Sequence, residues 1–305
     1  MKVLVLGGCG FIGSHIVDAL QSAGQSVRVF DRQPERFRKP LAKVDYRIGN
    51  FGDRMALIEA LSGMNAVIHL VSTTFPGTAD LDPKTDVQDN LAGTIALLDC
   101  MVSVGVSRIL FLSSGGTVYG IPKIVPIPES HPLCPINSYG IVKVAIESFL
   151  EMYRRTRGLS PVIMRASNPY GQRQGHTGVQ GVITTFLSRV MADEQIEIWG
   201  DGTVVRDYLN VADLARLCVK AIRSDAQGPY NAGSGVGTSV NEIINVVRRT
   251  TGKKIEPIYK ASRSTDVPLS ILDISRAQKD FVWAPTSDLD AGVAEIWAWM
   301  QTSAI

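Results

Sequence analysis

The sequence has few cysteines. Its 305 residues include only four cysteines, Cys9, Cys100, Cys134 and Cys218, and no two of them form a CxxC pair. This scarcity argues against a disulfide framework and against a thiolate metal site, and it is typical of a reducing compartment. No HxH or HExxH spacing is present either, so we expect a cytoplasmic protein without a metal ion.

An excess of charge and a long apolar run are also missing. The 31 basic and 29 acidic side chains leave a formal net charge of +2, so no general attraction to nucleic acid or to a membrane is expected. The first apolar run, KVLVL, is soon followed by glycines and is too short to span a bilayer. Since 45% of the residues are apolar, the chain can fill one large core or two smaller ones.

Short and long apolar patterns alternate in the first half of the chain. Helical spacing at residues 11–24 and 90–105 is interleaved with short β-branched runs, at residues 2–7, 26–31, 45–50, 66–71, 108–114 and 160–166. This alternation predicts an α/β fold of the Rossmann type, with a doubly wound parallel sheet. After residue 166 glycine-rich stretches interrupt the rhythm, which predicts a smaller α/β C-terminal domain that binds substrate.

The segment GGCGFIG lies between the first strand and the first helix. Its Gly7, Gly10 and Gly13 allow the backbone to approach a pyrophosphate at the positive end of the helix. Asp31 ends the second strand, where its carboxylate can bind ribose hydroxyls and repel a 2′-phosphate. NAD is therefore favoured over NADP, although Arg32 could partly compensate a phosphate.

The segment SYGIVK places Tyr139 and Lys143 four residues apart. On a helix this spacing puts both side chains on one face. A phenol has a pKa near ~10 in water, and a neighbouring ammonium stabilises its phenolate. Lys143 could thus prepare Tyr139 for proton transfer.

In this order the motifs resemble the extended short-chain dehydrogenase/reductase family, most closely its nucleotide-sugar 4-epimerases of the UDP-galactose epimerase type. The likeness covers nearly the whole chain and rests on GGCGFIGSH, HLV, NLAGT, SSGGTVYG, SYGIVK, RASNPYG, WGDG, VRDYLNVADL and RSTDVP. The resemblance implies a Rossmann domain at residues 1–166 plus about 207–233, and a nucleotide-sugar domain at about 167–206 and 234–305.

The resemblance also implies a permanently bound NAD. The residues that would hold it are Gly7, Gly10, Phe11, Ile12, Gly13, Asp31, Arg32, Asn50, Phe51, Leu70, Val71, Asn90, Tyr139 and Lys143. Asn50 and Phe51 would lie near the adenine, and Tyr139 and Lys143 near the nicotinamide ribose. The implied reaction oxidises C4 of a UDP-hexose to a 4-keto sugar, which turns over and is reduced on its other face.

For the substrate, the resemblance implies that Asn168, Arg206 and Arg263 approach the UDP pyrophosphate. This agrees with the preference of a diphosphate for guanidinium and amide donors. Trp199 would lie over the uracil and Asp266 near the uridine ribose. Ser270 occupies the position that faces the C2 substituent of the sugar, and its small size predicts that UDP-GlcNAc and UDP-GalNAc fit as well as UDP-glucose and UDP-galactose.

The sequence departs from this family at Gly115, where a serine or threonine normally bridges the tyrosine and the sugar. Ser114 and Thr117 are the candidate substitutes. If the chain stays extended, Thr117 shares the side of position 115 and Ser114 faces away. A bulge at Gly115 and Gly116 would bring Ser114 back, and a water is the third option.

Other reactions of the same family are disfavoured by this loop. The sugar 4,6-dehydratases carry an Asp-Glu pair where this chain has Gly116 and Thr117, and UDP-glucuronate decarboxylases carry a glutamate that is absent here. Two alternatives stay open: a reductase or dehydrogenase with exchangeable cofactor, and a catalytically weak nucleotide-sugar-binding homologue. The resemblance further implies a homodimer through the helices that follow Asp89 and Tyr139.

Overall fold

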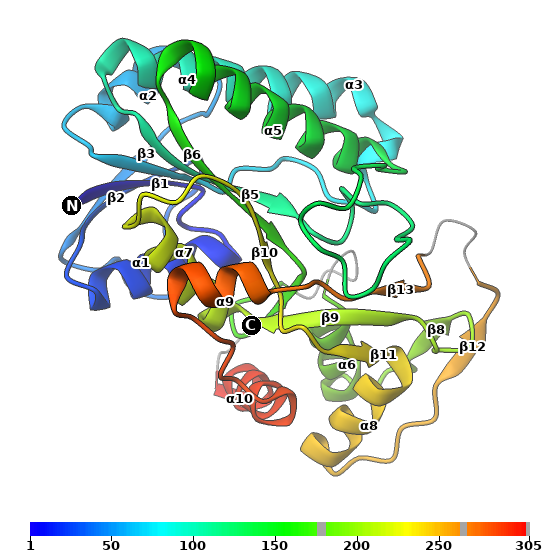
Figure 1. The fold of residues 1–305 in the computed structure, drawn as a ribbon. Helices are drawn as coiled ribbons and strands as arrows, with labels where there is room; N and C mark the ends of the chain where they lie inside the picture. The colour runs from blue at the N-terminus through cyan, green and yellow to red at the C-terminus, as the bar shows by residue number, and fades with distance from the viewer. Residues whose placement is uncertain (176–180, 263–266, 303–305) are drawn as a thin grey trace.

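The computed structural model describes residues 1–175, 181–262 and 267–302 (Figure 1). Its strands are β1 (Lys2–Leu6), β2 (Ser26–Asp31), β3 (Val44–Ile48), β4 (Ala66–His69), β5 (Arg108–Ser114), β6 (Ser160–Ala166), β7 (Asn168–Tyr170), β8 (Glu197–Trp199), β9 (Val205–Asn210), β10 (Gly228–Ala232), β11 (Gly237–Ser239), β12 (Ile258–Lys260) and β13 (Leu269–Ser270). Its helices are α1 (Phe11–Ser22), α2 (Arg54–Leu61), η1 (Ala79–Leu81), α3 (Pro83–Asp86), the π-helix η2 (Val87–Ala92), α4 (Gly93–Val104), α5 (Ser138–Arg157), α6 (Val182–Met191), α7 (Val211–Ile222), α8 (Val240–Thr251), α9 (Ser275–Phe281) and α10 (Leu289–Thr302).

Seven parallel strands form the central sheet, in the order β10-β6-β5-β4-β1-β2-β3. The six strands expected from the sequence are all present as β1–β6, and the predicted Rossmann-type fold is confirmed. Strands covered on both faces read as unbroken apolar runs, and Val3–Leu6 of β1 is accordingly buried throughout.

Helices cover both faces of this sheet (Figure 1). On one face α2, α4 and α5 enclose an apolar core that includes Leu4 and Phe111. On the other face α1 and α7 enclose a second core that includes Val5 and Leu214. α4 ends at Gly105 and α5 at Gly158, both in the left-handed conformation that terminates a helix at low cost.

A second group of elements lies beyond the carboxyl ends of the central strands. It contains the small sheet β11-β9-β13, with β7 paired to β9, and the separate pair β12-β8. Three helices, α6, α8 and α10, pack around a third apolar core that includes Leu187, Ile243 and Ile296.

The chain passes between these two groups several times. After β6 the chain leaves the central sheet and forms β7, α6, β8 and β9 in the second group. It then returns to the central sheet with α7 and β10. α9 then packs against β10, with the Tyr230 and Phe281 rings 4.6 Å apart, and Trp283 joins the same core. Part of the segment 234–305 therefore contributes side chains to the core of the central sheet.

Candidate functional site

The site lies where the carboxyl ends of β1, β4 and β5 meet, the edge at which such sheets bind ligands. Gly7, just after β1, is so close to the segment that follows β4 that a Cβ on it would lie 3.4 Å from the Val71 nitrogen and 3.5 Å from the Leu70 carbonyl carbon. The predicted residues Gly7, Leu70 and Val71 are thus brought together.

The glycine-rich turn has room only for backbone. Gly7 has a φ of +80°, and a Cβ at Gly13 would lie 2.1 Å from the Gly7 oxygen. α1 then begins at Phe11, and no described side chain caps it. Its first amides, those of Phe11, Ile12 and Gly13, lie at the end of a helix where an anion is stabilised. This turn fits a dinucleotide pyrophosphate.

Asp31 is fixed beside the turn. Its carboxylate accepts hydrogen bonds from the Cys9 amide (3.0 Å) and the Gln33 amide (3.2 Å). Asp31 is half-buried, whereas Arg32 is exposed. The geometry suits a carboxylate that binds ribose hydroxyls.

Phe51 and His69 form the wall next to this turn. Their rings stack with centroids 5.2 Å apart. Asn50, the residue before Phe51, accepts a hydrogen bond from the Gly52 amide through its side chain. His69 is buried and its Nε2 lies 2.9 Å from the Thr94 hydroxyl. Burial lowers the pKa of the His69 ring to about 3, with Lys143 adding to the fall, so the ring is neutral at physiological pH.

Tyr139 and Lys143 lie in the first two turns of α5, on one face as predicted. The Lys143 Nζ donates to the Leu112 oxygen (3.0 Å) and lies 5.4 Å from the centre of the Tyr139 ring. Burial raises the pKa of the Tyr139 phenol to about 12; Asp86 adds to this rise and a hydrogen bond with Ser72 opposes it. The Tyr139 side chain is half-buried, and the Lys143 side chain is buried beside its ring.

Burial also lowers the pKa of the Lys143 ammonium to about 8, while the Asp86 and Glu147 carboxylates oppose the fall. An ammonium that stays charged in this place favours the phenolate of its neighbour. The arrangement is suited to proton transfer at the Tyr139 hydroxyl.

Asp86 is a site residue that the sequence analysis missed. It is fully buried, and its carboxylate accepts hydrogen bonds from Thr74, Asn90 and Ser138. Asn90, which was predicted, also binds the Thr73 amide through its Oδ1 (2.9 Å). The only available signal was the spacing of Asp86 and Asn90, four residues apart on one helical face.

The loop after β5 does not stay extended. The Ser114 carbonyl accepts from the amides of Thr117 (3.4 Å) and Val118 (3.2 Å), which defines a turn. The premise that favoured Thr117 by alternation of side chains is therefore wrong, because Gly115 and Gly116 permit the turn. The Thr117 hydroxyl is buried with no hydrogen-bond partner among the described residues, and Ser114 is half-buried.

Position 115 has no space for a side chain. A Cβ on Gly115 would lie 2.6 Å from the Leu272 Cδ1 and 2.9 Å from the Arg165 oxygen. Leu272 comes from the segment after β13, so the C-terminal part of the chain closes this side of the site. A serine or threonine at position 115 would therefore clash with Leu272 and with the Arg165 backbone.

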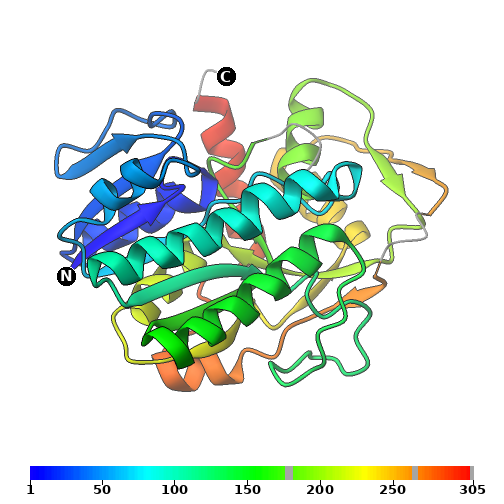
Figure 2. The same cartoon turned by 90° about the horizontal axis from the view of Figure 1, so that it is seen from above.

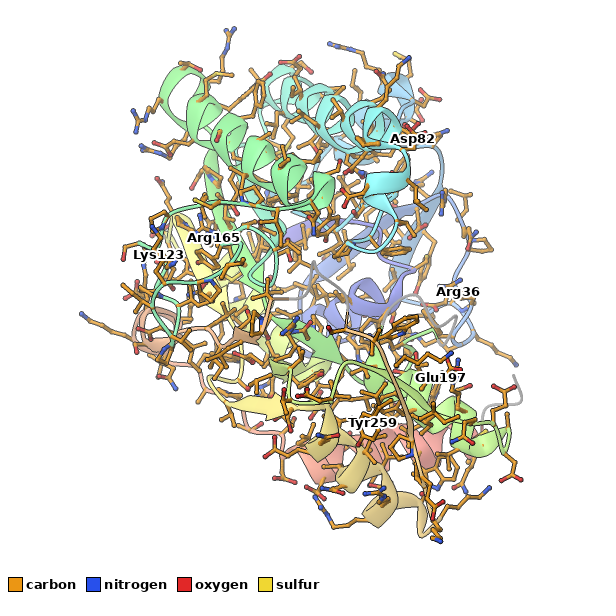
Figure 3. The ribbon with its side chains drawn as sticks, turned by 90° about the vertical axis from the view of Figure 1, so that its right-hand side faces the viewer. Arg36, Asp82, Lys123, Arg165, Glu197 and Tyr259 are labelled. Carbon is orange, nitrogen blue, oxygen red and sulfur yellow. The ribbon has the colours of Figure 1, made fainter. Side chains whose placement is uncertain are left out.

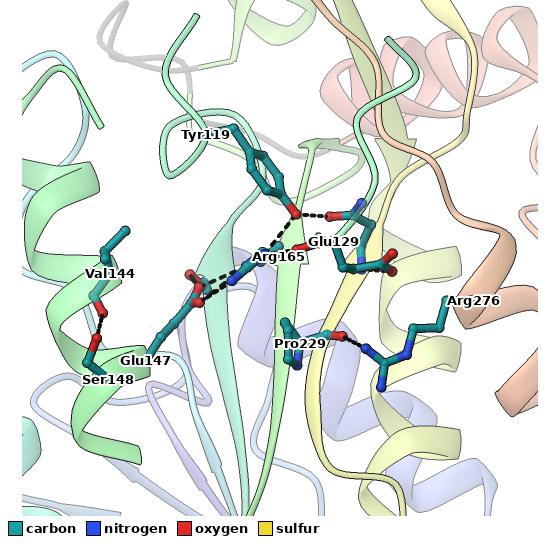
Figure 4. A network of polar contacts seen from close by, with 10 residues as sticks. Tyr119, Glu129, Val144, Glu147, Ser148, Arg165, Pro229 and Arg276 are labelled. Carbon is teal, nitrogen blue, oxygen red and sulfur yellow. Dashed lines mark hydrogen bonds and ion pairs between the residues drawn. The ribbon is translucent and has the colours of Figure 1, made fainter. Parts of the chain in front are cut away.

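A buried ion pair lies behind the loop (Figure 4). Arg165 of β6 meets Glu147 of α5 at 2.6 Å, and both side chains are about 95% buried. Glu147 also accepts from the Ser113 hydroxyl (2.5 Å), while the Arg165 Nη1 donates to the Tyr119 hydroxyl (3.0 Å) and the Glu129 carbonyl (3.1 Å). This network fixes β5, β6 and α5 relative to one another.

The predicted substrate residues lie in the second group of elements. Asn168 donates to the Asp207 oxygen (3.1 Å), and Arg206 donates to the Val205 (2.9 Å) and Val267 (2.5 Å) carbonyls. Ser270 is buried and pairs in register with Arg206 across β13 and β9. Arg263 and Asp266 lie outside the described residues.

Trp199 lies at a cavity of about 820 Å³ lined by Trp199, Gly200, Asp201, Val204, Tyr259, Lys260, Ser262 and Pro268. The Lys260 Nζ lies 5.8 Å from the centre of the indole. In Figure 3, Tyr259 lies in the lower part of the molecule, and Arg165 in the part that carries the central sheet. Lys260 is also ion-paired with Glu197 (2.7 Å), so the feature of this cavity that suits a planar ligand is the exposed aromatic face of Trp199.

Within residues 1–175, 181–262 and 267–302, no group of three or more His, Cys, Asp or Glu side chains is placed to hold a metal ion. In the same ranges no helix has both the length and the apolar character required to cross a bilayer.

Comparison with known proteins agrees with this geometry. The model of the NAD dependent epimerase/dehydratase family matches residues 3–233. The UDP-glucose 4-epimerase of Bacillus subtilis is 30% identical over 332 residues, covering 99% of this chain and 98% of the relative.

Solved structures resemble this chain over its full length. The Thermotoga maritima UDP-glucose 4-epimerase with UDP-glucose is 33% identical, with a TM-score of 0.93 and 99% of each chain covered. The Thermus thermophilus UDP-glucose 4-epimerase in complex with NAD is 30% identical, with a TM-score of 0.92 and 100% of each chain covered.

Proposed function

Because the chain belongs to the NAD dependent epimerase/dehydratase family, we propose that it is an enzyme that interconverts the C4 epimers of a UDP-hexose with NAD as its cofactor. The observation that carries the proposal is the placement of the half-buried Tyr139 and the buried Lys143 on one face of α5, at the sheet edge that also carries the glycine-rich turn. A proton acceptor next to a dinucleotide site is what a reversible oxidation of an alcohol requires.

When bound, NAD would supply a reversible acceptor for the hydride of C4. Tyr139 removes the proton of the C4 hydroxyl as the hydride leaves, which gives a 4-keto sugar. Lys143 stabilises the phenolate through its positive charge. After the ketone has turned over in the site, Tyr139 gives the proton back to the C4 oxygen as the hydride returns to the other face. Protons, hydride and cofactor are all restored at the end of the cycle.

Two sets of residues bind the two ligands, one the NAD and one the UDP-sugar. Gly7, Gly10, Phe11, Ile12 and Gly13 bind the pyrophosphate of NAD, Asp31 the adenosine ribose with Arg32 at its rim, Asn50 and Phe51 the adenine, and Leu70, Val71 and Asn90 the segment beside the nicotinamide. The UDP-sugar is bound at its pyrophosphate by Asn168, Arg206 and Arg263, at its uracil by Trp199, at its ribose by Asp266 and at its hexose by Ser270. The uncapped α1 and the cavity beside Trp199 support these assignments.

We also propose the homodimer and the two-domain division expected from the sequence, with the part of 234–305 around α9 and Trp283 assigned to the central sheet. α4 and α5 run side by side over the sheet (Figure 2), and they carry the exposed apolar side chains Val102, Ile141 and Met152. A two-fold pairing of this face would cover them.

The first test is to incubate the purified protein, without added cofactor, with UDP-galactose and separately with UDP-GalNAc. We expect the C4 epimers of both, followed by chromatography of the nucleotide sugars, because NAD is retained. A net change in NADH during turnover would instead favour a dehydrogenase. UDP binding without turnover, with NAD supplied, would favour the weakly catalytic homologue.

Ser114 is our candidate for the hydroxyl that replaces the one absent at Gly115. We expect Ser114→Ala to lower kcat by about 100-fold, because a hydrogen bond to the reacting oxygen is lost. Thr117→Val is the matched control and should change kcat little, since the Thr117 hydroxyl is enclosed by protein. The reverse pattern would assign the role to Thr117, and no effect of either would assign it to a water.

Ser270 is our candidate for the determinant of sugar range. We expect Ser270→Tyr to lower the ratio of kcat/KM for UDP-GalNAc to that for UDP-galactose by at least about tenfold, because a phenol fills the space of the N-acetyl group. Ser270→Ala should keep the ratio of the unmodified protein. An unchanged ratio in Ser270→Tyr would remove Ser270 from this role.

A further inference from the structure

We propose that Asp86 is a positioning residue, which acts through Tyr139 and Lys143 by holding the start of α5 and by supplying a fixed negative charge that keeps Lys143 protonated. The inference rests on the proposed function for its catalytic meaning. It concerns a carboxylate that belongs to neither the glycine-rich turn nor the substrate cavity.

The first support is the way Asp86 is held. Its Oδ1 accepts from the Thr74 hydroxyl and the Asn90 amide, both at 2.8 Å, and its Oδ2 accepts from the Ser138 hydroxyl at 2.7 Å. Ser138 is the first residue of α5 and directly precedes Tyr139. Asp86 thereby connects the segment after β4, the π-helix η2 and the first turn of the helix that carries the catalytic pair.

The second support is that Asp86 is fully buried and bonded only to neutral donors. It has no exposed surface, and none of the ion pairs between described residues includes it. Burying a carboxylate in this way is costly. The hydrogen bond to Ser138 places this carboxylate at the start of α5, next to Tyr139, and its charge opposes the fall in the pKa of the Lys143 ammonium.

Other charged and titratable groups also face this position. Asp80 of η1 accepts from the Ser138 amide (2.7 Å), His69 of β4 lies near Lys143, and Glu147 of α5 is paired with Arg165 of β6. On the Asp86 element itself, Asp82 and Lys84 are exposed. Glu147 is ion-paired with Arg165, whereas no ion pair between the described residues includes Asp86, although both carboxylates oppose the fall in the pKa of Lys143.

The direction of the effect follows from this charge. A negative neighbour raises the pKa of Lys143 and that of Tyr139 alike. Removing it therefore moves both values down. The pH profile of kcat/KM has one limb that follows deprotonation of Tyr139 and one that follows deprotonation of Lys143. Both limbs should move to lower pH together.

The test begins with a measurement that needs no substrate. Protein labelled with ¹³Cε-lysine is titrated by NMR, with the Lys143 signal assigned by its absence in Lys143→Arg. We expect Asp86→Asn to lower the titration midpoint of Lys143 by about one pH unit. Asp86→Ser is a second charge-free variant, whose small side chain leaves room for a water to bind the three donors. An unchanged midpoint in the folded charge-free variants would overturn the proposal.

Ser138→Ala is the matched control, because it removes one hydrogen bond and leaves the charge. It should lower kcat while the Lys143 midpoint and both limbs of the profile stay in place. A charge-free variant that lowers kcat without moving the limbs would reduce Asp86 to a structural residue. If the unmodified protein epimerises no UDP-hexose, the proposed function fails, whereas the NMR titration still decides the electrostatic role of Asp86.

Discussion

Tyr139→Phe should lower kcat for C4 epimerisation by about 1,000-fold, the largest effect on activity that we expect from a single substitution. The variant loses only the hydroxyl that exchanges the proton with the sugar. The phenyl ring keeps the packing of the first turn of α5, so the retained NAD and the binding of UDP should be unchanged. Chromatography of the epimers gives kcat, and the absorbance of the released cofactor gives the NAD content.

Tyr119→Phe is the matched control for this experiment. Tyr119 lies in the loop after β5, where its buried hydroxyl donates to the Asn231 Oδ1 (2.7 Å) and accepts from Arg165. Its loss should weaken folding and leave kcat of the folded enzyme within a few-fold. Equal losses in the two variants, or near-normal turnover by Tyr139→Phe, would contradict the assignment of Tyr139 as proton acceptor.

Arg165→Met should produce the largest loss of stability, about 3–5 kcal/mol in the free energy of unfolding. The substitution leaves the Glu147 carboxylate buried without its counter-charge, with only the Ser113 hydroxyl still donating to it. Urea unfolding followed by circular dichroism measures the change, with the midpoint and the slope compared to those of the unmodified protein.

The double variant Glu147→Gln/Arg165→Met separates this charge effect from lost packing. It should recover a large part of the stability, because no unpaired charge then stays buried. A double variant as unstable as Arg165→Met, or a single variant that loses less than about 1 kcal/mol, would show that the ion pair is not what makes Arg165 important.

Much of the fold could be predicted because local patterns and tertiary environment agree. β1 and β5 are covered on both faces, so their apolar runs are continuous, and the glycines after β1 stand at the one place where the backbone must turn tightly. Tyr139 and Lys143 could likewise be placed on one face, because their spacing is that of a helix.

Other parts depend on contacts distant in sequence. Asp86 ends a helix of four residues, and its role depends on Ser138, 52 residues later. Gly115 lies against Leu272, which no local pattern connects to it. Two adjacent glycines also allowed either an extended chain or a turn after β5, and only the packing around them decides between the two.

The order in which the central sheet is assembled has a consequence for biosynthesis. β10, the last strand to join, pairs with β6 but follows it in the chain by more than sixty residues, and the family match ends at residue 233, one residue after it. On the ribosome, β6 therefore stays an open edge while α6 to α7 are being made, and an open strand edge invites pairing with other chains. A gene fragment ending at residue 166 should accordingly yield an aggregating product, whereas one that continues through β10 encodes all seven strands and leaves β6 paired on both sides.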